Sequence, residues 1–334
     1  MKEKIHLLII GVGSIGERHL RCFQATERVE LTICELNDEL RNQVGERYGI
    51  TTRYDNLETA LEQKPDAALI AAPAHLHIPL AQTCAQAGCH LLIEKPLSTS
   101  TEGIDDLIQY TEQQKLITSV AFVYRAHPIV QAMKKAIDSG TFGKPLEVIT
   151  LSAQHFPTYR PAYREIYYNN HAAGGGLIQD SLPHVLNAVE WLVGPTTRIL
   201  ADAAHLKLDG VEVEDSANVL TRHGENSEIM GVFSSNQHQA PNETSITIVC
   251  EKGTLRFDYQ RNRWGWLTEP EGEWQYQNFT IGRDDLFTHQ ANSFLDAIEG
   301  KNKPACTLAE AKHTLLACLA ILKSSQQPPW IPIG

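Results

Sequence analysis

The sequence predicts an α/β protein in which an N-terminal, doubly wound parallel sheet is followed by an α+β domain on a large, open, mainly antiparallel sheet. Three observations lead to this prediction. Apolar runs alternate with helical patterns over the first third of the chain, a glycine-rich turn follows the first run, and the strand-like segments after about residue 125 become longer. The chain has 334 residues, 42% of them hydrophobic, which is enough for two domains of ordinary size.

The first third contains continuous apolar runs that are typical of strands buried on both faces. They cover residues 4–11, 29–35, 67–73, 90–96 and 116–124. Between them, apolar residues recur at helical spacing, and Asn37 and Asn56 stand at N-cap positions. Strands that alternate with helices predict right-handed crossovers and a parallel sheet.

The rest of the chain has a different pattern, which starts with a predicted helix at 128–140. The strand-like segments that follow cover residues 145–156, 197–208, 215–224, 227–237, 243–260 and 263–269. They alternate apolar and polar residues, which indicates an antiparallel sheet with one face solvated or used for association. Helices are expected at 284–300 and 308–325. We therefore expect two domains, 1–124 and 125–334, with the alternative that the last helix packs back on the first domain.

The composition limits the classes of molecule that the protein is expected to bind. The 29 basic and 40 acidic residues leave a formal net charge of −11, which repels nucleic acid and anionic membranes but still permits a local arginine cluster to bind a small anion. No apolar stretch approaches the roughly 20 residues of a membrane-spanning helix. The seven cysteines show no CxxC pair and no Cys/His ligand spacing, which predicts reduced thiols in a cytoplasmic protein and no metal site.

A G-x-G-x-x-G motif, "GVGSIG", stands between the first predicted strand and the first helix. In that context it is typical of dinucleotide binding, because Gly11 permits the tight turn, Gly13 lets the backbone approach a pyrophosphate, and Gly16 lets the helix pack on the strand. The amides of Ser14 and Ile15 then face the phosphates at the helix start. The alternative is a tight strand-to-helix turn without a ligand.

Glu35 ends the second predicted strand, where an acidic residue is expected to accept hydrogen bonds from the adenosine ribose hydroxyls. A phosphate on that ribose would meet the like charge of Glu35, and the segment "ELND" offers no nearby arginine to receive it. The sequence therefore favours NAD over NADP as the cofactor. The alternative for Glu35 is a surface carboxylate at a strand end.

Lys95 lies in the segment "EKP", at the carboxyl end of the strand predicted at 90–96, and "AAPAHLHIP" has the same place after the strand predicted at 67–73. Open parallel sheets bind ligands at this edge. The proline makes Lys95–Pro96 a candidate cis peptide that aims the lysine into a cleft. The alternative is a solvated surface lysine.

Four segments together resemble the glucose-fructose oxidoreductase / inositol dehydrogenase / MocA family: "GVGSIGERH", "APAHLHIPLA", "IEKPL" and "GGGLIQDSLPHVLNAVEWLVG". The resemblance covers nearly the whole chain. It implies an N-terminal NAD-binding Rossmann domain, a C-terminal substrate-binding domain on an open antiparallel sheet, and association through that sheet. Members of the family are mostly NAD(P)-dependent dehydrogenases of sugars, sugar nucleotides and cyclitols.

The resemblance also assigns roles to single positions. The lysine of the family's E-K-P motif corresponds to Lys95, and the aspartate and histidine of its G-G-x-x-x-D-x-x-x-H motif correspond to Asp180 and His184. Glu94 and His77 match positions near the nicotinamide or its ribose.

The chain departs from the family pattern in several places. Alanines replace the threonine and asparagine of the segment "AAPAHLHIP", so the backbone at Ala72 and Pro73 is expected to contact the cofactor. Arg125 keeps a family position and joins the cofactor-binding set. Tyr124 replaces a common polar residue, and Asn187 stands where many relatives have an aspartate; both are substrate candidates.

Asp180 and His184 are four residues apart, so at a helix start their side chains stack on one face. Pro183 suits the first helical turn, and the glycines before Asp180 let the chain approach a cleft without side chains. This arrangement fits oxidation of a secondary alcohol: His184 accepts the hydroxyl proton, Asp180 fixes the imidazole tautomer, and Lys95 hydrogen-bonds the same oxygen. The alternative for the pair is a surface or N-cap contact.

The segment "HFPTYRPAYREIYYNNH" carries arginines and aromatic rings that suit a carboxylate, a phosphate or a sugar ring. Its substrate candidates are His155, Tyr159, Arg160 and Arg164, which join Lys95, Tyr124, Asp180, His184 and Asn187. A loop that only covers the sheet explains the same residues equally well.

Together these features predict NAD-dependent hydride transfer between nicotinamide and a secondary alcohol of a sugar, sugar derivative or cyclitol, in a homodimer or homotetramer. Two alternatives stay open. One is a redox-neutral glycosidase of the same fold that uses NAD, and the other is a non-catalytic NAD-binding regulator. The presence of Lys95, Asp180 and His184 makes the regulator the weakest of the three.

Overall fold

The chain divides into two compact units. The structure, a computed structural model, describes residues 4–326, 330, 331 and 333. One unit comprises Met1–Ala126 and Gly282–Lys312, and the other His127–Ile281 and His313–Gly334. Residues 282–312, which we expect in the second domain, therefore cluster with the first unit.

The first unit is built on a six-stranded parallel sheet in the order β3-β2-β1-β4-β5-β6. Its strands are β1 (Ile5–Ile10), β2 (Val29–Cys34), β3 (Arg53–Tyr54), β4 (Ala67–Ile70), β5 (His90–Ile93) and β6 (Thr118–Val120). Every pair in it is parallel. The strand order reverses between β1 and β4, which confirms the predicted doubly wound sheet and places a ligand-binding edge at the carboxyl ends of these strands.

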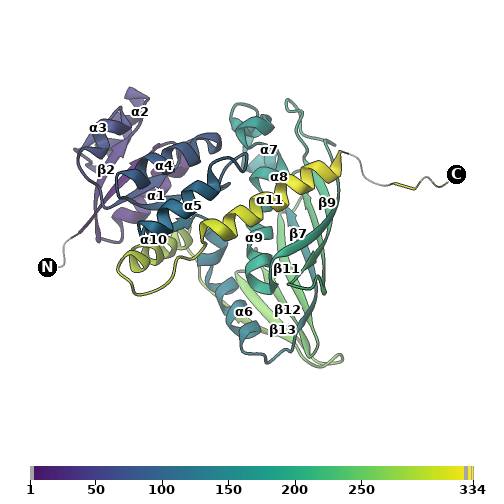
Figure 1. Cartoon of the computed structure of the whole chain (residues 1–334). Helices are drawn as coiled ribbons and strands as arrows, with labels where there is room; N and C mark the ends of the chain where they lie inside the picture. Colours follow the sequence, from purple (N-terminus) through teal and green to yellow (C-terminus); the bar gives the residue numbers. More distant parts are fainter. Residues whose placement is uncertain (1–3, 327–329, 332, 334) are drawn as a thin grey trace. The chain divides into compact units, whose positions relative to one another are not determined.

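Helices follow the strands of this unit (Figure 1). They are α1 (Ser14–Gln24), α2 (Asp38–Tyr48), α3 (Leu57–Leu61), α4 (His77–Gln86) and α5 (Ile104–Gln113), with 3-10 turns η1 (Ala74–Leu76) and η2 (Val123–Ala126). The side-chain oxygen of Asn37 accepts the amide of Leu40, and that of Asn56 accepts the amides of Glu58 and Thr59. Both predicted N-caps are therefore confirmed.

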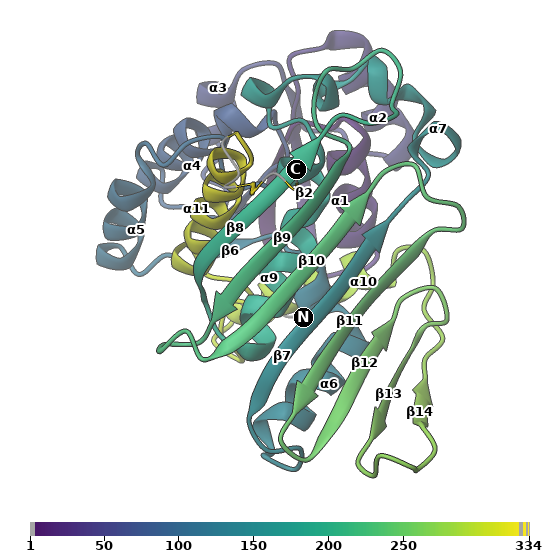
Figure 2. The same cartoon turned by 90° about the vertical axis from the view of Figure 1, so that its right-hand side faces the viewer.

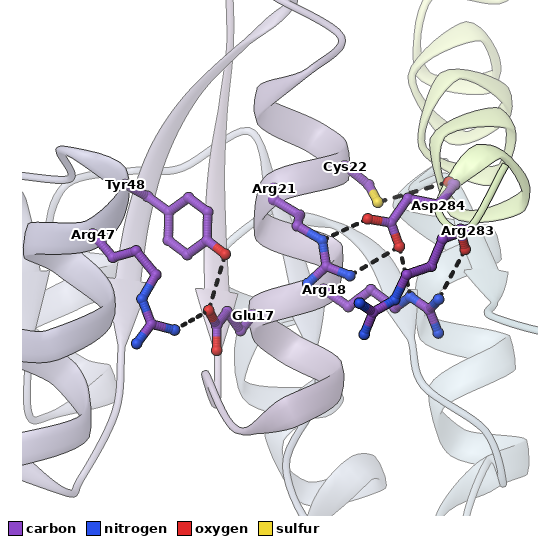
Figure 3. Close-up of polar contacts among 8 residues, drawn as sticks. All are labelled: Glu17, Arg18, Arg21, Cys22, Arg47, Tyr48, Arg283 and Asp284. Atoms are coloured by element: carbon purple, nitrogen blue, oxygen red, sulfur yellow. Dashed lines mark hydrogen bonds and ion pairs between the residues drawn. The ribbon is translucent and has the colours of Figure 1, made fainter. Parts of the chain in front are cut away.

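The late helix α10 (Asp285–Ile298) belongs to the first unit because it packs on α1. The rings of Phe23 and Phe294 meet edge to face, with their centroids 6.4 Å apart. Just before the helix, the carboxylate of Asp284 accepts hydrogen bonds from Arg21 Nε (2.6 Å) and Arg18 Nε (2.9 Å), two side chains that reach from α1 in Figure 3. The Arg21 guanidinium is the main cause that lowers the pKa of Asp284 to about 2.

The second unit is built on an eight-stranded sheet in the order β14-β13-β12-β11-β7-β10-β9-β8 (Figure 2). Its strands are β7 (Pro145–Ala153), β8 (Thr196–Ala204), β9 (Ser216–His223), β10 (Ile229–Asn236), β11 (Glu243–Cys250), β12 (Gly253–Asp258), β13 (Arg263–Leu267) and β14 (Gln275–Asn278). Only β7 and β10 pair in parallel, so the predicted, mainly antiparallel sheet is confirmed. The segment 243–260, expected as one strand, folds back at Glu251 and Lys252, because polar residues followed by Gly253 interrupt its apolar alternation.

Helices α6 (Pro128–Asp138) and α9 (Leu182–Val193) lie on one face of this sheet (Figure 2). Residues 156–180 form short helical turns. These are α7 (Phe156–Tyr159), η3 (Pro161–Arg164), η4 (Tyr167–Asn169), η5 (His171–Ala173) and α8 (Leu177–Asp180). The buried rings of Phe156, Tyr163 and Tyr168 form a small core cluster with Leu208, Val211 and Val213, which joins this segment to residues 208–213. Helix α11 (Leu308–Ser325) contains the point, between Lys312 and His313, at which the chain passes from the first unit to the second.

All seven cysteines are buried and none forms a disulfide. Over the described residues, no helix combines the length and the apolar composition that a membrane crossing requires.

Candidate active site

The glycine loop between β1 and α1 has the geometry that the motif predicts. Gly11 adopts φ +83°, and a Cβ there would lie 2.8 Å from the carbonyl oxygen of Ala71. A Cβ on Gly16 would collide with the carbonyl oxygen of Gly11, so helix and turn can only pack with glycine there. A Cβ on Gly13 would meet nothing within 4 Å. The space beside the start of α1, where Ser14 and Ile15 present helix-start amides, is therefore open for a ligand.

Glu35 follows β2 and is tied to the glycine loop. Its Oε2 accepts the amide of Val12 (3.0 Å) and its Oε1 accepts the amide of Asn37 (3.0 Å). The carboxylate thus lies beside the loop, where it can also accept hydrogen bonds from ribose hydroxyls. This donor and acceptor set fits a dinucleotide without a phosphate on that ribose.

The expectation that no arginine lies near Glu35 is wrong. Arg41, in the first turns of α2, donates from Nη1 to the main-chain oxygen of Glu35 (2.6 Å) and from Nη2 to the carboxylate of Asp38. Arg41 is six positions beyond Glu35 in the sequence, but the helix turns it back toward the end of β2. The guanidinium is already occupied by these two acceptors, so its presence does not remove the like-charge argument for Glu35.

The turn after β5 holds Lys95, and the Lys95–Pro96 peptide is cis, as the sequence suggests. Glu94, just before it, is buried, and its carboxylate accepts His19 Nε2 (2.7 Å) at one oxygen and the amide of Lys95 (2.8 Å) at the other. His77 lies on the opposite side of the turn. Its Nδ1 is 2.9 Å from the carbonyl oxygen of Pro96, and its Nε2 is 2.8 Å from that of Ala72.

These contacts connect three loops at the carboxyl edge of the sheet. His19 comes from α1 behind the glycine loop, His77 begins α4, and Ala72 precedes Pro73 in the loop after β4. Burial lowers the pKa of His77 against the opposing effect of the two carbonyl oxygens. The structure therefore brings together the glycine loop, Ala72, His77 and the lysine turn, all named from the sequence. His19 was not among the expected site residues.

Arg125 and Tyr124 lie in η2. The Arg125 guanidinium is buried and donates from Nη1 to Glu310 (2.5 Å) and to the carbonyl oxygen of Ala305 (3.2 Å). Burial would raise the pKa of Glu310, but the charge of Arg125 together with hydrogen bonds from Arg125 and Thr307 outweighs it, and the pKa is lowered. Arg125 thus joins η2 to the start of α11, and Tyr124 is half-buried beside it.

In the second unit, the three glycines before α8 allow a close approach within the unit. A Cβ on Gly175 would collide with the carbonyl oxygen of Tyr168, and one on Gly176 would lie 2.6 Å from the carboxylate of Glu214. Gly174 and Gly176 also adopt φ +88° and +86°, which disfavour other residues. These glycines therefore set the backbone that delivers Asp180 rather than lining an open surface.

Asp180 and His184 stand on two helices instead of one, because the helix is interrupted at Ser181 between α8 and α9. The Asp180 side chain is 1% exposed. Its Oδ1 accepts the Tyr167 hydroxyl (2.6 Å) and its Oδ2 accepts Arg160 Nη1 (2.9 Å). Two donors from the segment 156–173 thus hold the carboxylate that the sequence pairs with His184.

The remaining substrate candidates are dispersed. Tyr159 is exposed, with 61% of its surface accessible, whereas Asn187 is fully buried and donates from Nδ2 to Thr314 Oγ1 (2.9 Å). His155 and Arg164 line a cavity of about 460 Å³. Three further polar residues of that cavity were not anticipated because they come from other segments. They are Lys207, Asp209 and His238.

Comparisons with known proteins agree with the fold. Residues 5–122 match a family model described as an oxidoreductase family with an NAD-binding Rossmann fold, and residues 130–256 match the GFO/IDH/MocA C-terminal domain. Levoglucosan dehydrogenase from Pseudarthrobacter phenanthrenivorans is 23% identical over 99% of this chain and 98% of its own, and myo-inositol 2-dehydrogenase from Thermotoga maritima is 24% identical over 96% of both. A solved structure of levoglucosan dehydrogenase in complex with NADH covers 97% of both chains with a TM-score of 0.88 and 20% identity.

Proposed function

The chain belongs to the glucose-fructose oxidoreductase / inositol dehydrogenase / MocA family, and from this membership we propose that it is an NAD-dependent dehydrogenase acting on a secondary alcohol of a sugar, sugar derivative or cyclitol. The observation that carries the proposal is the turn around Lys95, in which the buried Glu94 is bound by His19 and Pro96 by His77. A lysine fixed at the edge where parallel sheets bind ligands is well placed for chemistry on that ligand.

The first unit supplies the cofactor site in this proposal. The open space at Gly13 and the helix-start amides of Ser14 and Ile15 would receive the pyrophosphate, and Glu35 the adenosine ribose. Glu94, His77, Ala72 and Pro73 would border the nicotinamide end. Arg125 supports this region through its ion pair with Glu310 rather than by a contact of its own. When bound, NAD supplies the acceptor for the hydride.

The chemistry proposed for the protein groups concerns the alcohol oxygen. We propose that His184 accepts the hydroxyl proton and that the Lys95 ammonium hydrogen-bonds the same oxygen, which stabilises negative charge as it develops. Asp180 would keep the His184 imidazole in one tautomer while it accepts from Tyr167 and Arg160, since a carboxylate has room for more than two donors. In the reverse direction, the same groups would polarise a ketone and return the proton.

The substrate would meet the segment 156–173 in the second unit. Arg160 and Tyr167 lie against Asp180, which favours them as neighbours of the reacting alcohol. His155 and Arg164 line the cavity described above, Tyr159 and Tyr124 are accessible enough to border a sugar ring, and Asn187 acts by fixing α9 on α11.

We further propose that the protein assembles as a homodimer or homotetramer through the second sheet. On the face opposite α6 and α9, Leu200, Leu220, Val232 and Ile149 stand in register across four neighbouring strands, and Leu220 is 55% exposed. An exposed apolar row of this kind is typical of an association surface. Light scattering of Leu220→Lys should show smaller particles than the parent protein. The seven buried, reduced cysteines fit a cytoplasmic enzyme.

The experiment that tests the function is a screen of aldoses, inositols, uronic acids and nucleotide sugars with NAD, followed by NADH absorbance. Formation of NADH with at least one of them supports the proposal. Release of sugar from a glycoside without net NADH would instead indicate a redox-neutral glycosidase, and stoichiometric NAD binding without any turnover a regulator. Mass spectrometry of co-purified cofactor separates NAD from NADP.

A further inference from the structure

The cavity of about 460 Å³ in the second unit is rich in groups that can carry positive charge. It is lined by His155, Pro157, Tyr163, Arg164, Lys207, Asp209 and His238. Among the residues that the structure describes, neither the guanidinium of Arg164 nor the ammonium of Lys207 has a carboxylate within ion-pair distance. Both residues are exposed, and they bring two cations without an acidic partner among the described residues to one cavity of a chain with a net charge of −11.

The guanidinium of Arg164 is held in one orientation. Its Nε donates to the carbonyl oxygen of Asp209 (2.7 Å), and its central carbon lies 4.8 Å from the centre of the Tyr163 ring. The Tyr163 hydroxyl donates to the same carbonyl oxygen (2.8 Å). Because the protein uses only Nε, the two terminal nitrogens remain for a ligand, and together they match a carboxylate or a phosphate.

Gly210 makes room for this arginine. It adopts φ +77°, and a Cβ at that position would lie 2.8 Å from Cδ and 3.0 Å from Nε of Arg164. Any side chain at residue 210 would therefore push the guanidinium away from its present place. The glycine is needed for the position of Arg164 as well as for the turn.

A buried carboxylate fixes the loop that carries Lys207 and Asp209. Asp215 is fully buried, and its two oxygens accept the amides of Leu206, Lys207 and Leu208 at 2.7–3.0 Å. Burial by itself would raise the pKa of Asp215, but these amide hydrogen bonds outweigh it and the pKa is lowered. The loop is thus built on a permanent negative charge inside the unit.

The two histidines are also oriented by the protein. Nε2 of His238 lies 2.9 Å from the hydroxyl of Ser216, which itself donates to Asp215. Nδ1 of His155 lies 2.8 Å from the hydroxyl of Thr158. Among the described residues, no hydrogen bond occupies the second nitrogen of either ring, so both imidazoles can contribute a hydrogen bond to a bound group.

We propose that this cavity binds an oxyanion, a carboxylate or a phosphate group, carried by the substrate. The proposal rests on the dehydrogenase function above, because it adds an anionic group to the sugar or cyclitol that the enzyme oxidises. The two arginines of segment 156–164 then have different roles. Arg160 binds Asp180, and Arg164, one turn later, binds the anion.

Calorimetric titration in saturating NADH, which cannot accept a hydride from the probe, tests the site, with glucose, glucuronate and glucose 6-phosphate as probes. At least one anionic probe should bind about tenfold or more tightly than glucose, and Arg164→Gln and Lys207→Gln should each weaken it by about the same factor. Lys252→Gln, an exposed lysine in the β11–β12 turn, is the matched control and should change nothing. Preference for glucuronate identifies a carboxylate, and preference for glucose 6-phosphate a phosphate. Equal affinity for all three probes, or no binding of either anion, overturns the proposal.

Gly210→Ala tests the position of the Arg164 guanidinium separately from the number of cations at the cavity. It removes no cation but displaces Arg164, so it should weaken the anionic probe and leave the affinity for glucose unchanged, with folding checked by thermal unfolding. An unaltered affinity for the anion in this variant contradicts the assigned position of Arg164. Since binding is measured without turnover, anion binding without NADH formation contradicts the dehydrogenase function alone, and oxidation of neutral sugars without anion binding contradicts this site alone.

Discussion

The lysine turn of the first unit and the Asp180 carboxylate of the second are anchored in different ways. Glu94 and Pro96, on either side of Lys95, are held by His19 from α1 and His77 from α4, two helices that pack on a parallel sheet. Asp180 is held by Arg160 and Tyr167, which come from short turns, and the Arg160 side chain is 46% exposed. In the proposed function, the cofactor side of the chemistry would therefore belong to the regular scaffold, while the substrate side would depend on a segment outside the strands of the sheet.

The largest effect is expected from His184→Ala, which removes the proposed general base. We expect kcat to fall by about 10²–10⁴-fold while the affinity for NAD changes little. Stopped-flow or steady-state NADH absorbance and a separate NAD titration measure the two quantities. His289→Ala, an exposed histidine on α10, serves as the control. Full activity of the His184 variant on the true substrate would refute its role.

Glu35→Ala should affect the binding of NAD, which the proposal assigns to the first unit. It removes the acceptor of the Val12 amide and the proposed partner of the ribose, so the Kd for NAD should rise by about 10- to 100-fold, with kcat at saturating NAD nearly preserved. Fluorescence titration with NADH measures the affinity. If the variant gains NADP binding through Arg41, the like-charge argument for NAD is strengthened; unchanged affinity for both cofactors contradicts it.

His19→Leu tests how the lysine turn is anchored, because His19 lies on α1 and binds the Glu94 side chain in that turn. The buried Glu94 carboxylate loses one donor, which should lower the free energy of unfolding by about 1–3 kcal/mol. Activity should fall for every substrate to the same extent, since the turn holds Lys95 and not the substrate. Urea unfolding and kcat/KM on two substrates test both parts. Rescue by His19→Gln, which keeps a donor, is expected in part.

Tyr167→Phe is the counterpart on the substrate side. It deletes one hydrogen bond to Asp180 and should lower kcat/KM by about fivefold, equivalent to about 1 kcal/mol, with unfolding almost unaffected. The size of the loss should differ between substrates, in contrast to His19→Leu. An equal loss of kcat/KM for all substrates, together with a lower free energy of unfolding, would contradict the distinction between the lysine turn and the Asp180 region.

The smallest effect concerns Asp284, whose pKa is lowered to about 2 chiefly by Arg21. A carboxylate with a lowered folded-state pKa stabilises above its unfolded pKa and loses that contribution as the pH falls through the folded value. Because the pair is partly exposed, Asp284→Asn should cost only about 1 kcal/mol at pH 7. Urea unfolding should show this difference shrinking between about pH 4 and pH 2. A difference that is independent of pH contradicts the ion-pair explanation.

What could be predicted from the sequence was local. The apolar runs, the glycine loop, the N-caps and the cis peptide before Pro96 depend on residues within a few positions of one another. The partners of the site residues did not follow in the same way. His19 and Glu94 are 75 positions apart, and the cavity joins residues near 155, 207 and 238, so only the topology brings them together. Arg41 could have been found, because helical spacing places it near Glu35, the residue that follows β2.

The parallel pairing of β7 with β10 has a consequence for the order of folding. β7 is made first but stands in the middle of its sheet, between the meander β8–β10 and the meander β11–β14. During synthesis its two edges stay without hydrogen-bond partners until the ribosome has added roughly a hundred residues more. Maturation of this sheet therefore waits for distant pairings, and a nascent chain that stalls before β11 exposes an apolar strand to aggregation.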